Sequence, residues 1–145
     1  MDNTKKNLML MVPMLHQGGF ERVCVTTARL MQEYYNVYIL IFSSKDINYD
    51  VTGLEVIDIN VPAQKGIVNK IINVIKRVVK TRRIKKKLDI DIAYSFGSSA
   101  NYVNVLSRRN EKVLRDFAVR LIWRTRSRSA SSVTARIRSF LVPKR

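Results

Sequence analysis

The chain has 145 residues, of which 46% are hydrophobic and 26% are charged, so its length and composition fit a single globular domain. Its 27 Lys and Arg residues outnumber 11 Asp and Glu residues, which gives a formal net charge of +16. Such a charge favours anionic partners, namely nucleotide phosphates, nucleic acid or an anionic membrane surface. Cys24 is the only cysteine, which excludes a disulfide framework within the chain and fits a reducing cytoplasm.

Short apolar runs alternate with helical patterns along the first part of the chain. Residues 8–12 form a continuous apolar run, as in a strand buried on both faces, and residues 20–35 repeat apolar positions at helical spacing. Further strands are predicted at residues 37–42, 54–59 and 90–96, further helices at 67–88 and 101–108, and a fifth strand from Lys112 onward. This order predicts an α/β fold, a Rossmann-like doubly wound parallel sheet with helices on both faces.

Two segments are expected at the carboxyl edge of this sheet, where ligands bind in such folds. The first, residues 16–22, carries Gly18 and Gly19 between a strand and a helix, and the second is residues 95–99. Two glycines permit positive φ and a close approach of a ligand to the backbone, and the N–H groups that begin a helix favour an anion such as a diphosphate. The alternative for the glycine pair is an ordinary strand-to-helix turn.

Other candidate side chains are expected to have no chemical role. His16 is the only histidine, and no titratable partner stands beside it in the motif, which favours a solvated loop residue over a general acid or base. Asp89 and Asp91 share one face of a strand but lie at its amino end, so a solvated role is favoured over a metal site or an acid–base pair. Cys24 lies in an apolar helical pattern and is expected to be a small buried hydrophobe. No metal site and no catalytic residue is predicted.

The predicted helix at residues 67–88 is amphipathic and strongly basic. Its apolar positions predict a stripe that packs on the sheet and leaves the basic face free. A free basic face can lie on anionic lipid, with about 1 kcal/mol from each nearby Lys or Arg. Nucleic acid is disfavoured, because no aromatic residue is interleaved with the basic ones. The residues predicted to contact a membrane are Lys76, Arg77, Lys80, Arg82, Arg83, Lys85, Lys86 and Lys87.

The composition of the chain changes near Leu114. Residues 1–113 contain 11 Lys and 7 Arg, whereas residues 114–145 contain 1 Lys and 8 Arg, and all 10 asparagines precede the change. Lys and Asn codons are rich in A and T, whereas most Arg codons contain more G and C. We therefore predict a folded domain at residues 1–113 and a poorly ordered, Arg- and Ser-rich tail at 114–145. A change of reading frame is favoured as its origin over a native basic tail that binds nucleic acid or lipid.

The segment VPMLHQGGFERV, residues 12–23, resembles the start of family 4 glycosyltransferases, in which a strand leads through a GG-x-ER-V turn into the first helix. The segment LDIDIAYSFGSSANYVNVLS, residues 88–107, is similar to the stretch of that family in which a strand emerges at the cleft. The resemblance covers residues 7–113 and implies the amino-terminal half of a GT-B fold, in which two Rossmann-like domains face each other across a cleft.

The resemblance also implies roles for particular residues. In this family the amino-terminal domain mostly holds the acceptor, the carboxyl-terminal domain holds most of the nucleotide-sugar donor, and no metal is needed in the active site. Gly18 and Gly19 would border the donor diphosphate and the transferred sugar. The residues expected on the acceptor side of the cleft are His16, Glu21, Arg22, Ser95, Phe96 and Gly97, with Glu21 and Arg22 as supporting or capping groups.

The family's paired-glutamate motif and nucleotide pocket do not occur in these 145 residues. We therefore expect the chain alone to lack activity, to need no cofactor, and to bind a nucleotide sugar only together with a second domain. The expected partner is a glycan or lipid-linked acceptor, and the expected location is the cytoplasm, at the inner face of the membrane. The alternative function is a basic module that binds an anionic membrane or nucleic acid.

Overall fold

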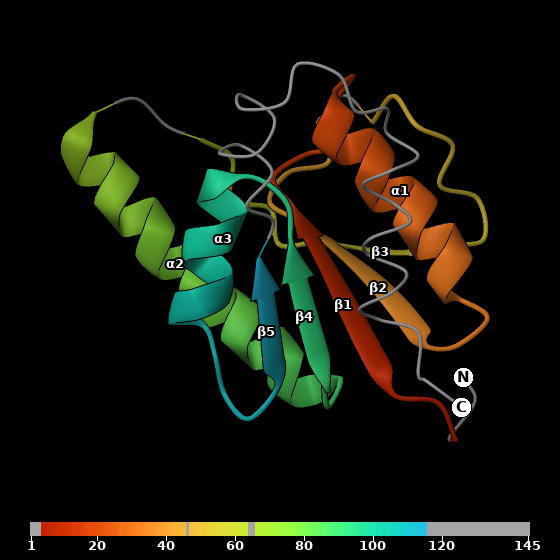
Figure 1. Cartoon of the computed structure of the whole chain (residues 1–145). Helices are drawn as coiled ribbons and strands as arrows, with labels where there is room; N and C mark the ends of the chain where they lie inside the picture. Colours follow the sequence, from red (N-terminus) through yellow and green to blue (C-terminus); the bar gives the residue numbers. More distant parts are fainter. Residues whose placement is uncertain (1–3, 46, 64–65, 116–145) are drawn as a thin grey trace, which may run out of the picture.

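The computed structural model describes residues 4–45, 47–63 and 66–115 of the chain. Strands and helices alternate along these residues, as Figure 1 shows. In chain order the elements are β1 (Asn7–Val12), α1 (Gly19–Met31), β2 (Asn36–Ile41), β3 (Glu55–Asp58), α2 (Ile67–Lys87), β4 (Ile92–Ser95), α3 (Ser98–Leu106) and β5 (Lys112–Arg115).

The strands form one parallel sheet in the order β3-β2-β1-β4-β5. In the centre, Leu8 of β1 is in register with Val37 of β2 on one side and with Ile92 of β4 on the other. The sheet therefore grows outward from β1 in both directions, and the order of strands reverses between β1 and β4. This arrangement confirms the predicted Rossmann-like, doubly wound α/β fold.

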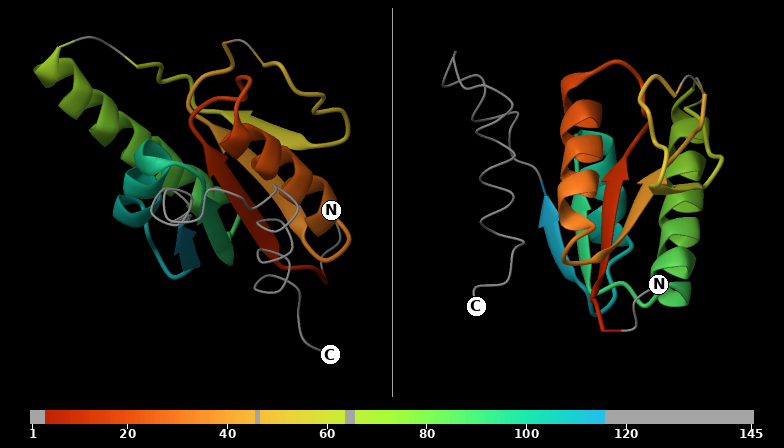
Figure 2. Two further views of the ribbon diagram at one scale, coloured as in Figure 1. Left: turned by 45° about the horizontal axis from the view of Figure 1, so that its top comes forward. Right: turned by 90° about the vertical axis from the view of Figure 1, so that its right-hand side faces the viewer.

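Helices cover both faces of the sheet, which explains why β1 is apolar from Leu8 to Val12. Leu10 points to one face and packs with Cys24 and Ala28 of α1. Met11 points to the other face and belongs to the same core cluster as Val103 of α3. Figure 2 shows α1 on one side of the sheet and α2 on the other. A central strand buried on both faces has no polar side, so it reads as a continuous apolar run.

Helix α2 does not pack on the sheet as the sequence predicts. Its buried residues are Asn73, Thr81 and Lys85, which are all polar. In its first turn, Ile67 and Val68 are 78% and 69% exposed. The expectation that the apolar stripe covers the sheet is therefore wrong for the amino-terminal half of α2, although partly buried apolar residues nearer its other end do contact the core.

The last strand crosses the predicted boundary between the domain and the tail. Strand β5 ends at Arg115, so Leu114 and Arg115 belong to the sheet although the composition changes there. Of the tail predicted at residues 114–145, residues 116–145 lie outside the described residues, so the predicted disorder and reading-frame change stay predictions.

Candidate functional site

A ligand crevice is expected at the carboxyl ends of β1 and β4, because ligands in open α/β sheets bind where the strand order reverses. The Phe96 backbone N–H donates to the Met11 carbonyl oxygen at 2.8 Å, which brings the ends of the two strands together. A Cβ atom on Gly97 would lie 4.0 Å from Phe20 Cδ2, so the loop after β4 meets the start of α1. The two segments predicted to share this edge are therefore adjacent.

The backbone of Gly18 is held by neighbouring side chains. The Tyr49 hydroxyl donates a hydrogen bond to the Gly18 carbonyl oxygen at 2.8 Å. The Gly18 backbone N–H donates to the same hydroxyl oxygen at 3.2 Å. A Cβ atom on Gly18 would collide with the Glu21 carboxylate. That carboxylate lies at the positive end of the α1 dipole, where an anionic ligand would also be stabilised. A diphosphate beside Gly18 would therefore have to displace Glu21.

Both glycines of the pair are exposed, but only Gly19 has open space at its Cβ position. It is exposed as the first residue of α1, and a Cβ atom on it would meet nothing within 4 Å. Neither glycine has a positive φ, since Gly18 is extended at −167° and Gly19 is helical. The expectation that the two glycines are needed for positive φ is thus wrong. The close approach of a ligand to the backbone stays a prediction for Gly19.

His16 and Arg22 are exposed next to this turn. The His16 Nδ1 atom accepts a hydrogen bond from the Gln17 backbone N–H at 3.1 Å, and Asn48 Nδ2 lies 3.4 Å from the same atom. An accepting Nδ1 places the ring proton of a neutral imidazole on Nε2. The roles of His16 and Arg22 in binding a ligand stay predictions.

Ser95 and Phe96 do not line the crevice. Both residues are fully buried. The Ser95 hydroxyl donates to Asn101 Oδ1 at 2.7 Å and accepts from Asn104 Nδ2 at 3.1 Å, so its hydrogen bonds run into the protein. Phe96 stands edge-on to Tyr94 in the core beneath α1, with 4.6 Å between ring centroids. The predicted contacts of Ser95 and Phe96 with an acceptor are wrong, because neither residue has accessible surface.

Gly97, the third residue of this segment, has accessible surface and an unusual backbone conformation. It is half-buried and forms the turn from β4 into α3. Its φ of 82° and ψ of 155° lie in a region that only glycine adopts readily. The backbone therefore requires a glycine at position 97. The sequence pattern predicts such a positive φ for Gly18 and Gly19 instead.

Cys24 is not a reactive group. Burial, with a smaller effect from the Glu21 charge, raises the pKa of its thiol well above the ordinary value of 9.0. This confirms the prediction of a small buried hydrophobe. Within residues 4–45, 47–63 and 66–115, no group of three His, Cys, Asp or Glu side chains is placed to hold a metal ion.

The basic residues predicted to contact a membrane divide into three groups. Lys85 has only 1% of its side chain exposed, so a membrane contact for it is wrong. Arg77 donates to the Val61 carbonyl oxygen at 3.0 and 2.8 Å, and Lys80 donates to the Ile59 carbonyl oxygen at 2.7 Å, so these two attach α2 to the chain after β3. The exposed remainder is Lys76, Arg82, Arg83, Lys86 and Lys87.

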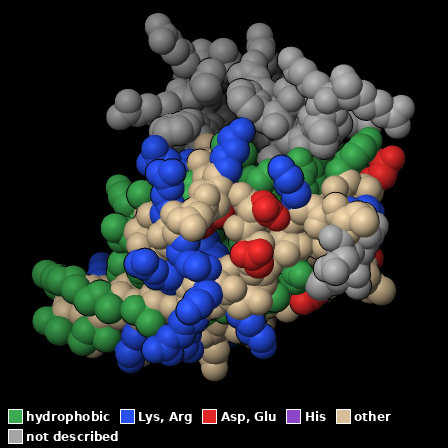
Figure 3. All heavy atoms as spheres, turned by 90° about the horizontal axis from the view of Figure 1, so that it is seen from below, with side chains coloured by type: hydrophobic (Ala, Val, Ile, Leu, Met, Phe, Trp, Pro, Cys, Tyr) green, Lys and Arg blue, Asp and Glu red, His purple; other side chains and the backbone are tan. Residues whose placement is uncertain are grey.

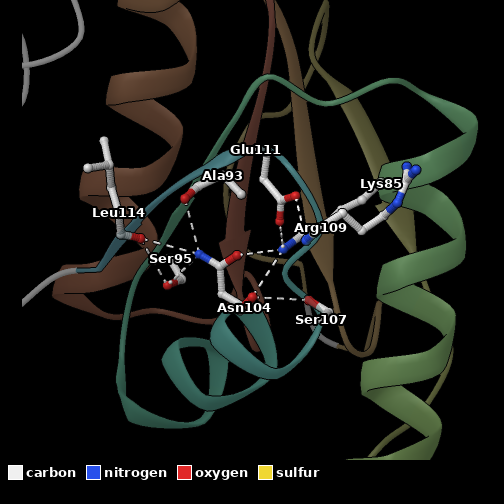
Figure 4. A network of polar contacts seen from close by, with 8 residues as sticks. All are labelled: Lys85, Ala93, Ser95, Asn104, Ser107, Arg109, Glu111 and Leu114. Carbon is white, nitrogen blue, oxygen red and sulfur yellow. Dashed lines mark hydrogen bonds and ion pairs between the residues drawn. The ribbon is translucent and has the colours of Figure 1, made fainter.

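Lys85 is instead the centre of a buried polar network, shown in Figure 4. Its Nζ donates to Glu111 Oε1 at 2.7 Å and to Asn104 Oδ1 and the Asn104 carbonyl oxygen at 2.8 and 3.1 Å. Asn104 Nδ2 donates in turn to the Ala93 carbonyl oxygen at 3.1 Å. The network joins α2, α3, β4 and the chain before β5, so it fixes β4, one of the two strands at the expected ligand edge.

Acid should weaken this network. Burial raises the pKa of the Glu111 carboxyl, but hydrogen bonds from Lys85 Nζ and from backbone N–H groups outweigh burial and hold it below its ordinary value of 4.5. A carboxyl whose pKa is lower in the folded state stabilises the fold above its unfolded pKa, and this contribution is lost as the pH falls through the folded pKa. We therefore expect the free energy of unfolding to fall more steeply below pH 4.5 than in a Glu111→Gln variant. Urea unfolding at a series of pH values measures both curves, and parallel curves would contradict the expectation.

Sequence reasoning missed Tyr49, Asn48, Asn104 and Glu111. Tyr49 and Asn48 lie in a loop without periodic apolar positions, and no local pattern marks their contact with the turn after β1. Asn104 offers a signal, because it is a polar residue among the apolar positions of α3. A buried amide must find hydrogen-bond partners, so such a position predicts a polar network.

The strand order defines a Rossmann-like α/β domain, and the expected ligand edge of such a domain is the β1/β4 reversal. No known family model and no curated protein matches the chain. Its structure is similar to a glycosyltransferase from Rickettsia africae ESF-5, with a TM-score of 0.62 and 18% identity over 79% of this chain and 30% of that one. It is also similar to MurG from Acinetobacter baumannii, with a TM-score of 0.62 and 18% identity over 82% of this chain and 39% of that one.

A third similar structure is the apo form of the lipopolysaccharide outer core galactosyltransferase WaaB. The TM-score is 0.58 and the identity 13%, over 76% of this chain and 32% of that one. The described residues share the Rossmann-like α/β fold of these glycosyltransferase structures, which confirms the resemblance at the level of the fold. It spans only 30–39% of the length of these three structures.

Proposed function

We propose that this chain is the acceptor-side half of a nucleotide-sugar-dependent glycosyltransferase of glycan or cell-envelope polysaccharide synthesis. The observation that supports this most is the reversal of strand order between β1 and β4, in a fold similar to that of three glycosyltransferase structures. Gly19 gives a ligand access to the backbone there, and exposed His16 and Arg22 supply polar groups for the hydroxyl groups of a glycan.

The partner of this half is a glycan or a lipid-linked acceptor, and a nucleotide sugar binds only when a second domain completes the crevice. Transfer requires donor and acceptor to be held in one geometry, so one side of a cleft does not suffice. The 145 residues alone are therefore inactive in this proposal. No other cofactor is required.

The protein would act in the cytoplasm, at the inner face of the membrane. None of the helices in the described part of the chain is long and apolar enough to cross a bilayer. The exposed Lys and Arg residues of α2 favour attachment to anionic lipid at the surface. They also support the second candidate function, a basic binding module without enzymatic activity. Nucleic acid is the weaker partner for it, because no aromatic side chain is interleaved with these residues.

A comparison of two proteins tests the enzymatic proposal. The coding sequence beyond residue 145 is read in all three frames, and any longer chain with a second Rossmann-like domain is expressed beside the 145-residue chain. We expect the longer chain to transfer sugar from a panel of UDP- and GDP-sugars to a lipid-linked acceptor, and the shorter chain to show no turnover above donor hydrolysis. Turnover by the 145 residues alone, or a coding sequence without a second domain in any frame, would overturn the proposal and favour the binding module.

A further inference from the structure

Helix α2 turns a polar side toward the rest of the protein. Asn73, Arg77, Thr81 and Lys85 follow one another at intervals of four residues and are buried or half-buried. At ~100° per residue, each step of four residues turns by about 40°, so these positions form one inclined row along the helix. Asn73 donates to the Pro62 carbonyl oxygen at 3.2 Å, and Arg77 and Lys85 make the hydrogen bonds described above. These hydrogen bonds, together with the partly buried Val78 and Ile84 that pack against the core, attach α2 to the domain.

The apolar side of α2 is exposed to solvent. At ~100° per residue, its apolar positions centre about a third of a turn away from the polar row. They extend over the amino-terminal half of the helix, about 18 Å at ~1.5 Å per residue. Figures 1 and 2 show this half projecting beyond the sheet. The residues, 37–78% exposed, are Ile67, Val68, Ile71, Ile72, Val74, Ile75 and Val79. A contiguous apolar surface of this kind marks a binding site.

The same side of α2 becomes cationic toward the carboxyl end of the helix. By the helical rotation, Arg82, Arg83 and Lys86 continue the angular range of the apolar residues. The helix contains no Asp or Glu. Figure 3 shows hydrophobic side chains gathered at the projecting end and Lys and Arg side chains gathered beside them. One side of α2 thus passes from apolar to positively charged along its length.

We propose that this side of α2 inserts into an anionic lipid surface, with the amino-terminal end deepest and with Arg82, Arg83 and Lys86 against the lipid phosphates. The inference rests on the membrane location proposed above and names the surface and the mode of binding. An anionic membrane presents the same order, a layer of phosphate charge over an apolar layer. A second copy of the chain fits less well. If two α2 helices paired in parallel, their positively charged ends would lie against each other and repel. If they paired antiparallel, the charged end of one helix would lie against the apolar end of the other.

Vesicle binding at two salt concentrations separates insertion from surface attraction. The full chain is sedimented with vesicles of equal phosphatidylglycerol and phosphatidylcholine in about 0.1 M and about 1 M NaCl, since the Debye length falls from ~10 to ~3 Å between them. We expect the wild type to stay bound in high salt, because salt does not screen apolar contacts. A Val68→Gln/Ile71→Gln/Ile75→Gln variant should bind at least roughly tenfold more weakly there.

The control for the apolar variant is Leu30→Gln. Leu30 is a 40% exposed residue of α1, on the opposite face of the sheet, and its substitution should leave binding unchanged. Glutamine retains high helix propensity, so both proteins should keep the wild-type melting temperature. An Arg82→Gln/Arg83→Gln/Lys86→Gln variant should lose binding mainly in low salt and bind as the wild type does in high salt.

Three outcomes would overturn the inference, and they point to different causes. Release of the wild type in high salt, with no effect of the apolar substitutions, would leave the membrane location standing and exclude insertion. Absence of binding to these vesicles in low salt would overturn the location as well, whereas the sugar-transfer assay tests the enzymatic proposal separately. A dimer in sedimentation that the apolar substitutions dissociate, without a change in vesicle binding, would assign the surface to a second copy of the chain.

Discussion

A Lys85→Met variant is expected to lose about 3–5 kcal/mol of the free energy of unfolding, because it leaves the Glu111 carboxylate buried without its partner. Both side chains of the pair are 1% exposed, and their N–O distance is 2.7 Å. The Asn104 carbonyl and amide oxygens lose a donor in the same variant. Small domains are stable by only about 5–15 kcal/mol, so such a loss should be plain in urea or thermal unfolding.

The matched control is Lys86→Met, the same substitution one position along α2 at an exposed site. It should change the free energy of unfolding by no more than about 0.5 kcal/mol. A Lys85→Met/Glu111→Leu variant should recover part of the loss, because apolar replacement of both partners removes the unpaired buried charge. Equal effects of Lys85→Met and Lys86→Met would contradict the structural role of the pair.

The buried network has a consequence for the crevice. Asn104, which accepts from Lys85, also donates to the Ser95 hydroxyl at 3.1 Å. Ser95 ends β4, directly before the turn that meets α1. The ion pair between α2 and the chain before β5 thus supports the edge at which a ligand is expected. It does so through hydrogen bonds with fixed directions rather than through apolar contacts alone.

The fold was predictable because its signals are local. The apolar run of β1 and the helical spacing in α1 each arise from the environment of one segment, so consecutive residues carry the pattern. The order of these elements then predicts the parallel sheet. The orientation of α2 was not predictable in this way. Periodicity reveals that a helix has an apolar side, but hydrogen bonds to distant groups, such as that of Lys80 to Ile59, decide which side faces the protein.

The candidate site was predictable in position but less so in detail. Topology brings the turn after β1 and the turn after β4 to one edge, whatever their side chains are. The contacts within that edge join residues far apart in sequence, as Tyr49 does with Gly18. Lys85 gave no signal at all, since it reads as one lysine in a basic run and its partner Glu111 lies 26 positions further on.

The two glycine segments at this edge should respond in opposite ways to alanine. Gly97→Ala is expected to cost about 1–3 kcal/mol of the free energy of unfolding, because its backbone conformation is essentially confined to glycine. The cost is conformational rather than steric, since a Cβ atom there would make only an ordinary contact with Phe20 at 4.0 Å. Gly19→Ala should leave the stability unchanged or raise it by up to about 1 kcal/mol, because Gly19 is helical and open to solvent.

Urea unfolding of both variants beside the wild type measures this contrast. A loss in Gly19→Ala as large as that in Gly97→Ala would mean that the turn after β1 carries a backbone constraint that its φ values do not indicate. Under the expected result, the absence of a side chain at Gly19 has no structural cause in this domain. In the proposed function, a side chain there would stand where the ligand approaches the start of α1.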